Sequence, residues 1–165
     1  MSEQSTLSLY LPDAGATDAL AGLLAMTQPE SAIVHLEGDL GAGKSTLARA
    51  WLRALGVDGP IRSPTYTLVE RYRLRDGREA LHLDLYRIGD AGELEFLALD
   101  DAAAALWLVE WPERGLRALP PAGLRVALAV EADGRRCRLH GLGSAGERWL
   151  ADLAPHCRLG AFPEP

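Results

Sequence analysis

The sequence of 165 residues contains little cysteine, no long apolar run and almost no lysine. Its two cysteines, Cys137 and Cys157, do not have metal-like spacing, so we expect both to be reduced thiols. No segment approaches the roughly 18 uninterrupted apolar residues that a membrane span needs. The opening residues, MSEQSTLSLYLPD, have neither the basic region nor the apolar core of a signal peptide. We therefore expect a cytoplasmic protein that does not contact a membrane.

The chain also has no excess of positive charge. Its formal net charge of −6 disfavours a dedicated nucleic-acid-binding domain, because such domains are usually basic. Arginines nevertheless gather around two predicted turns. The favoured interpretation of the first group is solvated hairpin edges, and a direct contact with nucleic acid there stays open. The groups are Arg71, Arg73, Arg75 and Arg78, and Arg135, Arg136 and Arg138.

The scarcity of lysine points to one position. Of the 17 lysines and arginines, the only lysine is Lys44, in the stretch LEGDLGAGKSTLARAW. Gly38 to Ser45 matches the pattern G-x-x-x-x-G-K-[ST] at every fixed position, after a predicted strand and before a predicted helix. Glycines let such a turn wrap around phosphate, and lysine supplies a compact charge on a flexible stem that the wider arginine fork does not match. We expect Lys44 to reach the β- and γ-phosphates of a nucleotide and the Ser45 hydroxyl to hold Mg²⁺.

Apolar periodicity predicts an α/β protein with a mixed central sheet flanked by helices. We expect residues 1–158 to form a single domain and residues 159–165 to form a short, frayed, proline-rich tail. Ser144, with Glu147 three residues later, is the predicted cap of the last helix. The predicted strands are 7–11, 31–37, 66–74, 79–85, 104–111, 124–131 and 135–140, and the predicted helices are 16–26, 45–55, 92–99 and 144–154.

Two carboxylates follow apolar strands. Asp84 lies near the end of LHLDLY and Glu110 ends ALWLVE, and ligands of open α/β sheets gather at the carboxyl ends of strands. Glu110 therefore resembles the acidic metal-site position of P-loop enzymes, the alternative being an acid that faces solvent. Asp84 either serves the same site or caps a loop.

Hydroxyl and imidazole groups add two weaker candidates. Thr65, in the loop of residues 62–67, either touches Mg²⁺ or the γ-phosphate, or belongs to a turn whose hydroxyls bond their own backbone. His82 shares a strand face with Asp84, and it either orients Asp84 or is a satisfied histidine at a sheet edge. Guanine-specific GTPases read the base with an Asn-Lys-x-Asp segment, which needs a second lysine, so ATP is the expected nucleotide.

Five segments occur in the order and spacing of the bacterial TsaE (YjeE) proteins, and the chain resembles that family over roughly residues 8–155. The segments are GDLGAGKST, SPTYTLV, HLDLYR, ELEFLALDD and LVEWPE. The resemblance implies a P-loop NTPase fold and a small ATPase required for making threonylcarbamoyladenosine in tRNA. It also implies action with TsaD, which carries the transfer chemistry, and with TsaB, which pairs with TsaD. The chain would then meet tRNA indirectly, through that complex.

The resemblance also assigns site residues. Ser45 and Glu110 hold Mg²⁺, and Lys44, Asp84 and Glu110 serve catalysis. Ser45 stands where family members commonly have threonine, which retains the hydroxyl. The turn after Asp133 reads Gly-Arg-Arg, so Arg135 and Arg136 are hard to separate as the arginine near the nucleotide, and Trp111 lies near it by contact or packing. The expected nucleotide contacts are Leu40, Gly41, Ala42, Gly43, Lys44, Ser45, Thr46, Thr65 and Arg135.

Two other functions fit the residues alone. A P-loop kinase for a small metabolite would need a phosphoacceptor pocket and usually an arginine-bearing lid. No obvious lid segment is present, and only the arginines of residues 71–78 could be assigned that role. A nucleotide-gated binding module would use residues 63–67 as its switch, with incidental hydrolysis.

Overall fold

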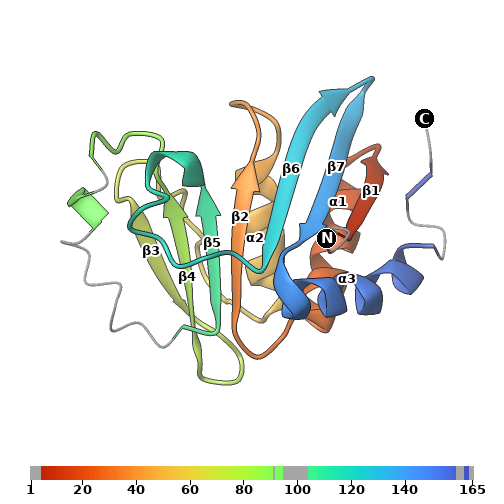
Figure 1. Cartoon of the computed structure of the whole chain (residues 1–165), viewed down its shortest axis with the longest axis horizontal. Coiled ribbons are helices and arrows are strands. Elements are labelled where there is room, and N and C mark those ends of the chain that lie inside the picture. Colours follow the sequence, from red (N-terminus) through yellow and green to blue (C-terminus); the bar gives the residue numbers. More distant parts are fainter. Residues whose placement is uncertain (1–4, 91, 95–103, 159–161, 164–165) are drawn as a thin grey trace.

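The computed structural model describes residues 5–90, 92–94, 104–158 and 162–163. These residues form a seven-stranded mixed sheet in the order β1-β7-β6-β2-β5-β4-β3, together with three α-helices (Figure 1). The strands are β1 Thr6–Leu11, β2 Ala32–Glu37, β3 Val69–Arg73, β4 Glu79–Asp84, β5 Leu106–Glu110, β6 Leu124–Glu131 and β7 Gly134–Gly141. The helices are α1 Ala14–Thr27, α2 Lys44–Ala54 and α3 Gly143–Cys157, with a short 3-10 helix, η3, at Pro112–Arg114. The predicted α/β class and mixed sheet are confirmed.

Parallel pairing in the middle of the sheet brings three strand ends to one edge. β2 pairs in parallel with β5 and with β6, and β5 pairs in parallel with β4. In this register Glu110 lies opposite Leu36 on one side and Asp84 on the other. The antiparallel hairpins β3–β4 and β6–β7, and the pairing of β1 with β7, complete the sheet. The edge formed by the carboxyl ends of β2, β4 and β5 carries the site described below.

Most helix and strand starts lie within two residues of the sequence prediction, and β3 begins three residues later than predicted. Helix α1 begins at Ala14, because the carboxylate of Asp13 accepts a hydrogen bond from the Ala16 amide and caps the helix. Helix α3 begins at Gly143 after Leu142, which makes no side-chain cap bond, so the predicted Ser144 cap is wrong.

The strand predicted from Tyr66 begins only at Val69. The Leu68 amide instead donates to the Pro64 carbonyl, and Leu68 has a φ of 67°, which closes a turn before the strand. Residues 92–94 form a single helical turn, and the remainder of the helix predicted over residues 92–99 lies outside the described residues. So does most of the predicted tail, residues 159–165.

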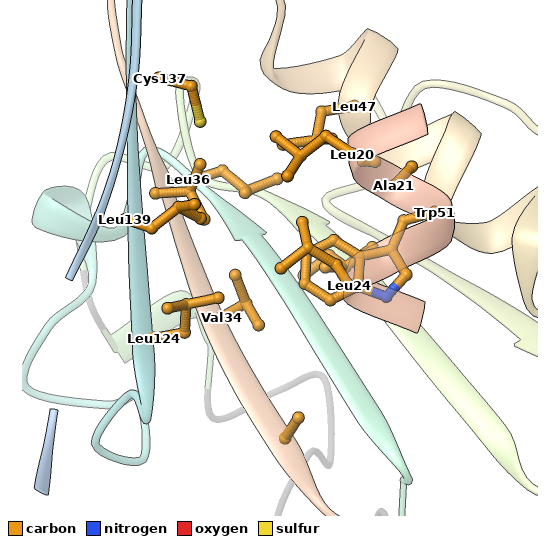
Figure 2. Close-up of a cluster of buried hydrophobic side chains, with 14 of the residues drawn as sticks. Leu20, Ala21, Leu24, Val34, Leu36, Leu47, Trp51, Leu124, Cys137 and Leu139 are labelled. Atoms are coloured by element: carbon orange, nitrogen blue, oxygen red, sulfur yellow. The ribbon is translucent and has the colours of Figure 1, made fainter. Parts of the chain in front are cut away.

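The larger hydrophobic core lies between the sheet and the helices (Figure 2). Val34 and Leu36 of β2 and Leu124 and Leu139 of β6 and β7 point toward a layer of helical side chains. That layer consists of Leu20, Ala21 and Leu24 of α1 and Leu47 and Trp51 of α2. The packing fixes the position of α2, and so of the loop that precedes it.

A smaller core covers the opposite face of β4 and β5. Leu81 and Leu83 of β4 and Trp107 and Val109 of β5 pack there with four other buried side chains, which are Leu85, Ile88, Leu94 and Ala104. Their neighbours in sequence, such as Leu106 and Leu108, belong to the larger core, as strand alternation requires. Strands β4 and β5 are therefore covered by apolar side chains on both faces.

The expectation of two reduced thiols is confirmed. Cys137 and Cys157 are both free and buried. Burial raises the pKa of Cys137 to about 12 and that of Cys157 to about 11. None of the helices in the described part of the chain has the length and apolar character of a bilayer span.

Candidate functional site

The glycine-rich loop connects the end of β2 to the first turn of α2, as the motif predicts. Gly38 has a φ of 146°, and a Cβ there would collide with the backbone carbonyl of Leu128. Gly41 and Gly43 have φ values of 81° and 108°, with open space where a Cβ would stand. Gly38 is therefore required for close packing of the loop against β6, whereas Gly41 and Gly43 supply a backbone conformation.

Lys44 lies folded back over this loop and is only 5% exposed. Its ammonium group donates to the carbonyls of Gly38, at 2.6 Å, and Asp39, at 3.0 Å, and lies 4.6 Å from the ring centre of Trp111. Burial lowers the pKa of Lys44, and the nearby carboxylates of Glu110 and Asp84 act in the opposite direction. Lys44 therefore places a positive charge at the entrance of α2, where the N-terminus of a helix favours an anion.

Glu110 is the best-buried carboxylate of the site, with an exposed fraction of 2%. The Ser45 hydroxyl donates to its Oε1 at 2.8 Å and to its Oε2 at 3.0 Å. The Nε2 atom of His82 lies 2.6 Å from the same Oε2 atom. The solvent-facing alternative for Glu110 is therefore wrong: this acid faces the first turn of α2.

Asp84 and Thr65 meet beside Glu110. The Thr65 hydroxyl donates to Oδ2 of Asp84 at 3.3 Å and lies 2.7 Å from the Ser63 hydroxyl. Oδ1 of Asp84 accepts from the Tyr86 amide at 3.0 Å. Asp84 thus buttresses its own loop and also lies in register with Glu110, so both interpretations made from the sequence describe part of its geometry.

These side chains line a cavity of about 250 Å³ above the glycine-rich loop. Arg135, at the start of β7, closes one side of it by donating to the carbonyls of Ala42, at 3.1 Å, and Gly41, at 3.2 Å. Arg136 points elsewhere, and pairs with Glu131 at 2.7 Å. Strand alternation therefore separates two arginines that the sequence leaves equivalent. The lining residues are Leu40, Gly41, Gly43, Lys44, Ser45, Thr46, Thr65, Asp84, Tyr86, Glu110, Trp111 and Arg135.

A second cavity of about 250 Å³ adjoins the first on the far side of Arg135. The two share Gly43, Thr46 and Arg135. The second is lined in addition by Ala42, Leu128, Asp133, Gly134 and the segment Leu11–Ala14 with Thr17. All of the residues expected at the nucleotide thus line one or both cavities.

Sequence reasoning missed two features of this site. His82 contacts Glu110 and not Asp84, because a residue on β4 reaches diagonally to the strand-end residue of β5, and β4 is an interior strand rather than a sheet edge. Trp111 adopts a left-handed conformation, with a φ of 56°, and its ring contacts both Lys44 and Tyr86. A diagonal contact of this kind requires the strand register, which no single segment reveals.

The oxygen atoms of the site suit a magnesium ion. Mg²⁺ prefers hydroxyl and carboxylate oxygens and is usually held by one or two protein groups plus phosphates and water. Ser45 and Glu110 supply such oxygens within hydrogen-bond distance of each other, and Asp84 lies in the neighbouring register position. Among the described residues, no group of three or more His, Cys, Asp or Glu side chains is arranged to hold a metal ion. A magnesium ion held by one or two protein groups together with phosphates and water does not need such a group.

The sheet and the glycine-rich loop define the class of protein: an α/β chain of the P-loop NTPase type. In a structural comparison, the crystal structure of YdiB from Bacillus subtilis superimposes with a TM-score of 0.78 at 26% identity, covering 94% of this chain and 99% of that one.

Sequence comparison identifies the family. The family model described as threonylcarbamoyl adenosine biosynthesis protein TsaE matches residues 11–138. The tRNA threonylcarbamoyladenosine biosynthesis protein TsaE of Haemophilus influenzae is 40% identical over 141 residues, or 81% of this chain and 89% of that protein. Its counterpart in Bacillus subtilis is 33% identical over 144 residues, or 85% and 89% of the two chains. The chain belongs to the TsaE family.

Proposed function

We propose that this chain is a Mg²⁺-dependent ATPase that supports the formation of threonylcarbamoyladenosine in tRNA by a partner complex of TsaD and TsaB. Membership of the TsaE family supports the pathway. The observation that carries the activity is the contact of Ser45 with Glu110 at the mouth of the glycine-rich loop, beside the ammonium group of Lys44. That combination of hydroxyl, carboxylate and lysine is the one P-loop enzymes use for phosphoryl transfer.

The two adjoining cavities suggest how ATP lies in the site. The phosphates occupy the cavity around Gly41, Lys44 and Ser45, where backbone amides and the α2 dipole favour an anion. The nucleoside occupies the second cavity, lined by Pro12, Thr17 and Leu128. Arg135 stands between the two and neutralises phosphate charge.

Each polar side chain then has a separate task. Lys44 exchanges its loop carbonyls for β- and γ-phosphate oxygens. Ser45 and Glu110 hold the magnesium ion, which neutralises charge on the phosphates when it is bound. Asp84, kept in place by Thr65 and the Tyr86 amide, orients the attacking water. Water positioning and charge stabilisation supply most of phosphoryl-transfer catalysis, so loss of either carboxylate cripples the protein.

The test is ATP turnover by the purified chain, alone and then with TsaB and TsaD, with Lys44→Ala as the blank. We expect slow Mg²⁺-dependent turnover that responds to the partners and vanishes in the blank. An Asp152→Asn variant, altered at an exposed position on α3, is the matched control and retains turnover. Turnover that ignores the partners contradicts the accessory role, and phosphorylation of an added small molecule would identify a kinase instead.

A further inference from the structure

His82 is a buried ionisable group to which the proposed reaction assigns no task. It is 0% exposed, and its Nε2 atom lies 2.6 Å from Oε2 of Glu110. Among the described residues its other ring nitrogen, Nδ1, has no hydrogen-bond partner. The imidazole therefore makes one strong polar contact and leaves its second nitrogen unsatisfied.

This imbalance argues against a purely structural role. A buried polar atom without a partner destabilises the fold, and an apolar side chain of the same length would fill the space without that cost. What an apolar side chain would not provide is the Nε2 contact. In both the neutral Nε2–H tautomer and the imidazolium form, Nε2 donates to the carboxylate.

The second partner of Glu110 shows why this donor matters. Among the described residues, the side-chain hydrogen-bond partners of Glu110 are Ser45 and His82. Ser45 belongs to the expected Mg²⁺ site, so its hydroxyl serves the ion as well as the carboxylate. His82 comes from the neighbouring strand β4 and has no second task. In the described part of the chain, this contact holds the carboxylate in place independently of the ion.

We propose that His82 is a positioning residue that orients the Glu110 carboxylate toward Ser45 and so sets the affinity of the site for Mg²⁺. This inference rests on the proposed function. Partners that orient a metal-binding side chain typically change metal affinity by 10- to 100-fold when they are removed. His82 would act on the ion only through Glu110, without touching nucleotide.

A matched pair of variants separates the hydrogen bond from the packing. In His82→Gln the amide nitrogen is as many bonds from Cβ as the imidazole Nε2, so the donor is retained. In His82→Met the side chain extends as many bonds from Cβ but ends in a methyl group, so the donor is lost. Binding of a non-hydrolysable ATP analogue is measured by calorimetry, with Mg²⁺ and again with EDTA.

We expect His82→Met to weaken analogue binding by about tenfold in Mg²⁺ and to leave binding in EDTA unchanged. His82→Gln should restore most of the loss. If the parent protein binds the analogue equally with and without Mg²⁺, the proposed function fails and this inference fails with it. If the parent shows the Mg²⁺ effect and His82→Met retains it, or if both variants lose it equally, only this inference is overturned.

A measurement on the unaltered chain covers the case in which His82→Met does not fold. Nitrogen-15 NMR distinguishes the ring nitrogens, and the His82 signals are those missing from His82→Gln. We expect a proton on Nε2, and a shift of that signal when Mg²⁺ is added to the analogue-bound protein. A neutral ring with its proton on Nδ1 would overturn the proposal.

Discussion

The hydroxyl of Ser45 donates to both carboxylate oxygens of Glu110, at 2.8 and 3.0 Å, across 65 residues of sequence. Ser45 lies in the first turn of helix α2 and Glu110 ends strand β5, and the packing of α2 on the sheet brings them together. The contact joins the phosphate loop to the acidic edge of the sheet.

Removing the Ser45 hydroxyl should damage the proposed Mg²⁺ site. We expect Ser45→Ala to lower Mg²⁺-dependent ATP turnover by at least about tenfold, because the ion loses an oxygen ligand and Glu110 loses a hydrogen-bond donor. Ser45→Thr keeps the hydroxyl and should retain turnover. Steady-state kinetics at a series of Mg²⁺ concentrations measures both, and equal activity in Ser45→Ala and the parent would refute the assignment.

The glycines of the loop should respond differently to alanine. Gly38→Ala places a methyl group against the Leu128 carbonyl at positive φ, so we expect a loss of more than about 2 kcal/mol in the free energy of unfolding. Gly41→Ala meets open space and should cost only about 1 kcal/mol from its left-handed backbone. Urea unfolding compares the two, and a larger loss in Gly41→Ala would contradict this account of the loop.

The two adjacent arginines should have separate effects. We expect Arg135→Gln to weaken ATP binding by about tenfold, because its guanidinium borders the phosphate cavity. Arg136→Gln removes the pair with Glu131 and a cation–π contact with Tyr10, so it should lower stability by about 1–2 kcal/mol and leave ATP binding unchanged. Calorimetric titration with ATP measures both variants. Equal weakening in the two would show that the strand register does not decide which arginine serves the site.

Alkaline pH should destabilise the protein through its buried thiols. Burial raises the pKa of Cys137 to about 12 and of Cys157 to about 11, from an ordinary value of 9.0. Below pH 9 both the folded and unfolded states hold these protons, so the full stability is present. As the pH rises above 9 only the unfolded state releases them, so the free energy of unfolding falls toward pH 11 and 12.

Urea unfolding between pH 7 and 10 measures this fall, and a Cys137→Ala, Cys157→Ala double variant is the comparison. Its stability should start lower because of the core cavity, but decline less steeply with pH. Parallel declines in the two proteins would mean that other groups cause the loss.

Local patterns in the sequence predict much of this molecule. The glycine-rich loop, the hairpins and the acids at strand ends each depend on a few consecutive residues, and each appears in the structure where expected. The element boundaries that were predicted wrongly depend on single local features. Asp13 caps α1 at its start, and the left-handed conformation of Leu68 closes a turn before β3.

Two features of the site depend on long-range register: the partner of His82, which sequence reasoning placed wrongly, and the choice between Arg135 and Arg136, which it left open. His82 reaches Glu110 diagonally across two parallel strands. Arg135 contacts the loop because alternate side chains of β7 point to opposite faces of the sheet, and its own points toward the loop. Strand order and pairing register decide both, and neither is encoded in a short segment.

The central claim is that ATP hydrolysis at this site, and not nucleotide binding alone, supports modification of tRNA. The direct test is the yield of threonylcarbamoyladenosine in a reconstituted reaction with TsaD, TsaB and tRNA, in which the parent chain is replaced by Asp84→Asn or by the control Asp152→Asn. We predict that Asp84→Asn still binds ATP but supports little product, while the control supports as much as the parent. Full product with Asp84→Asn, in the absence of turnover, would contradict the account and identify a nucleotide-gated binding module.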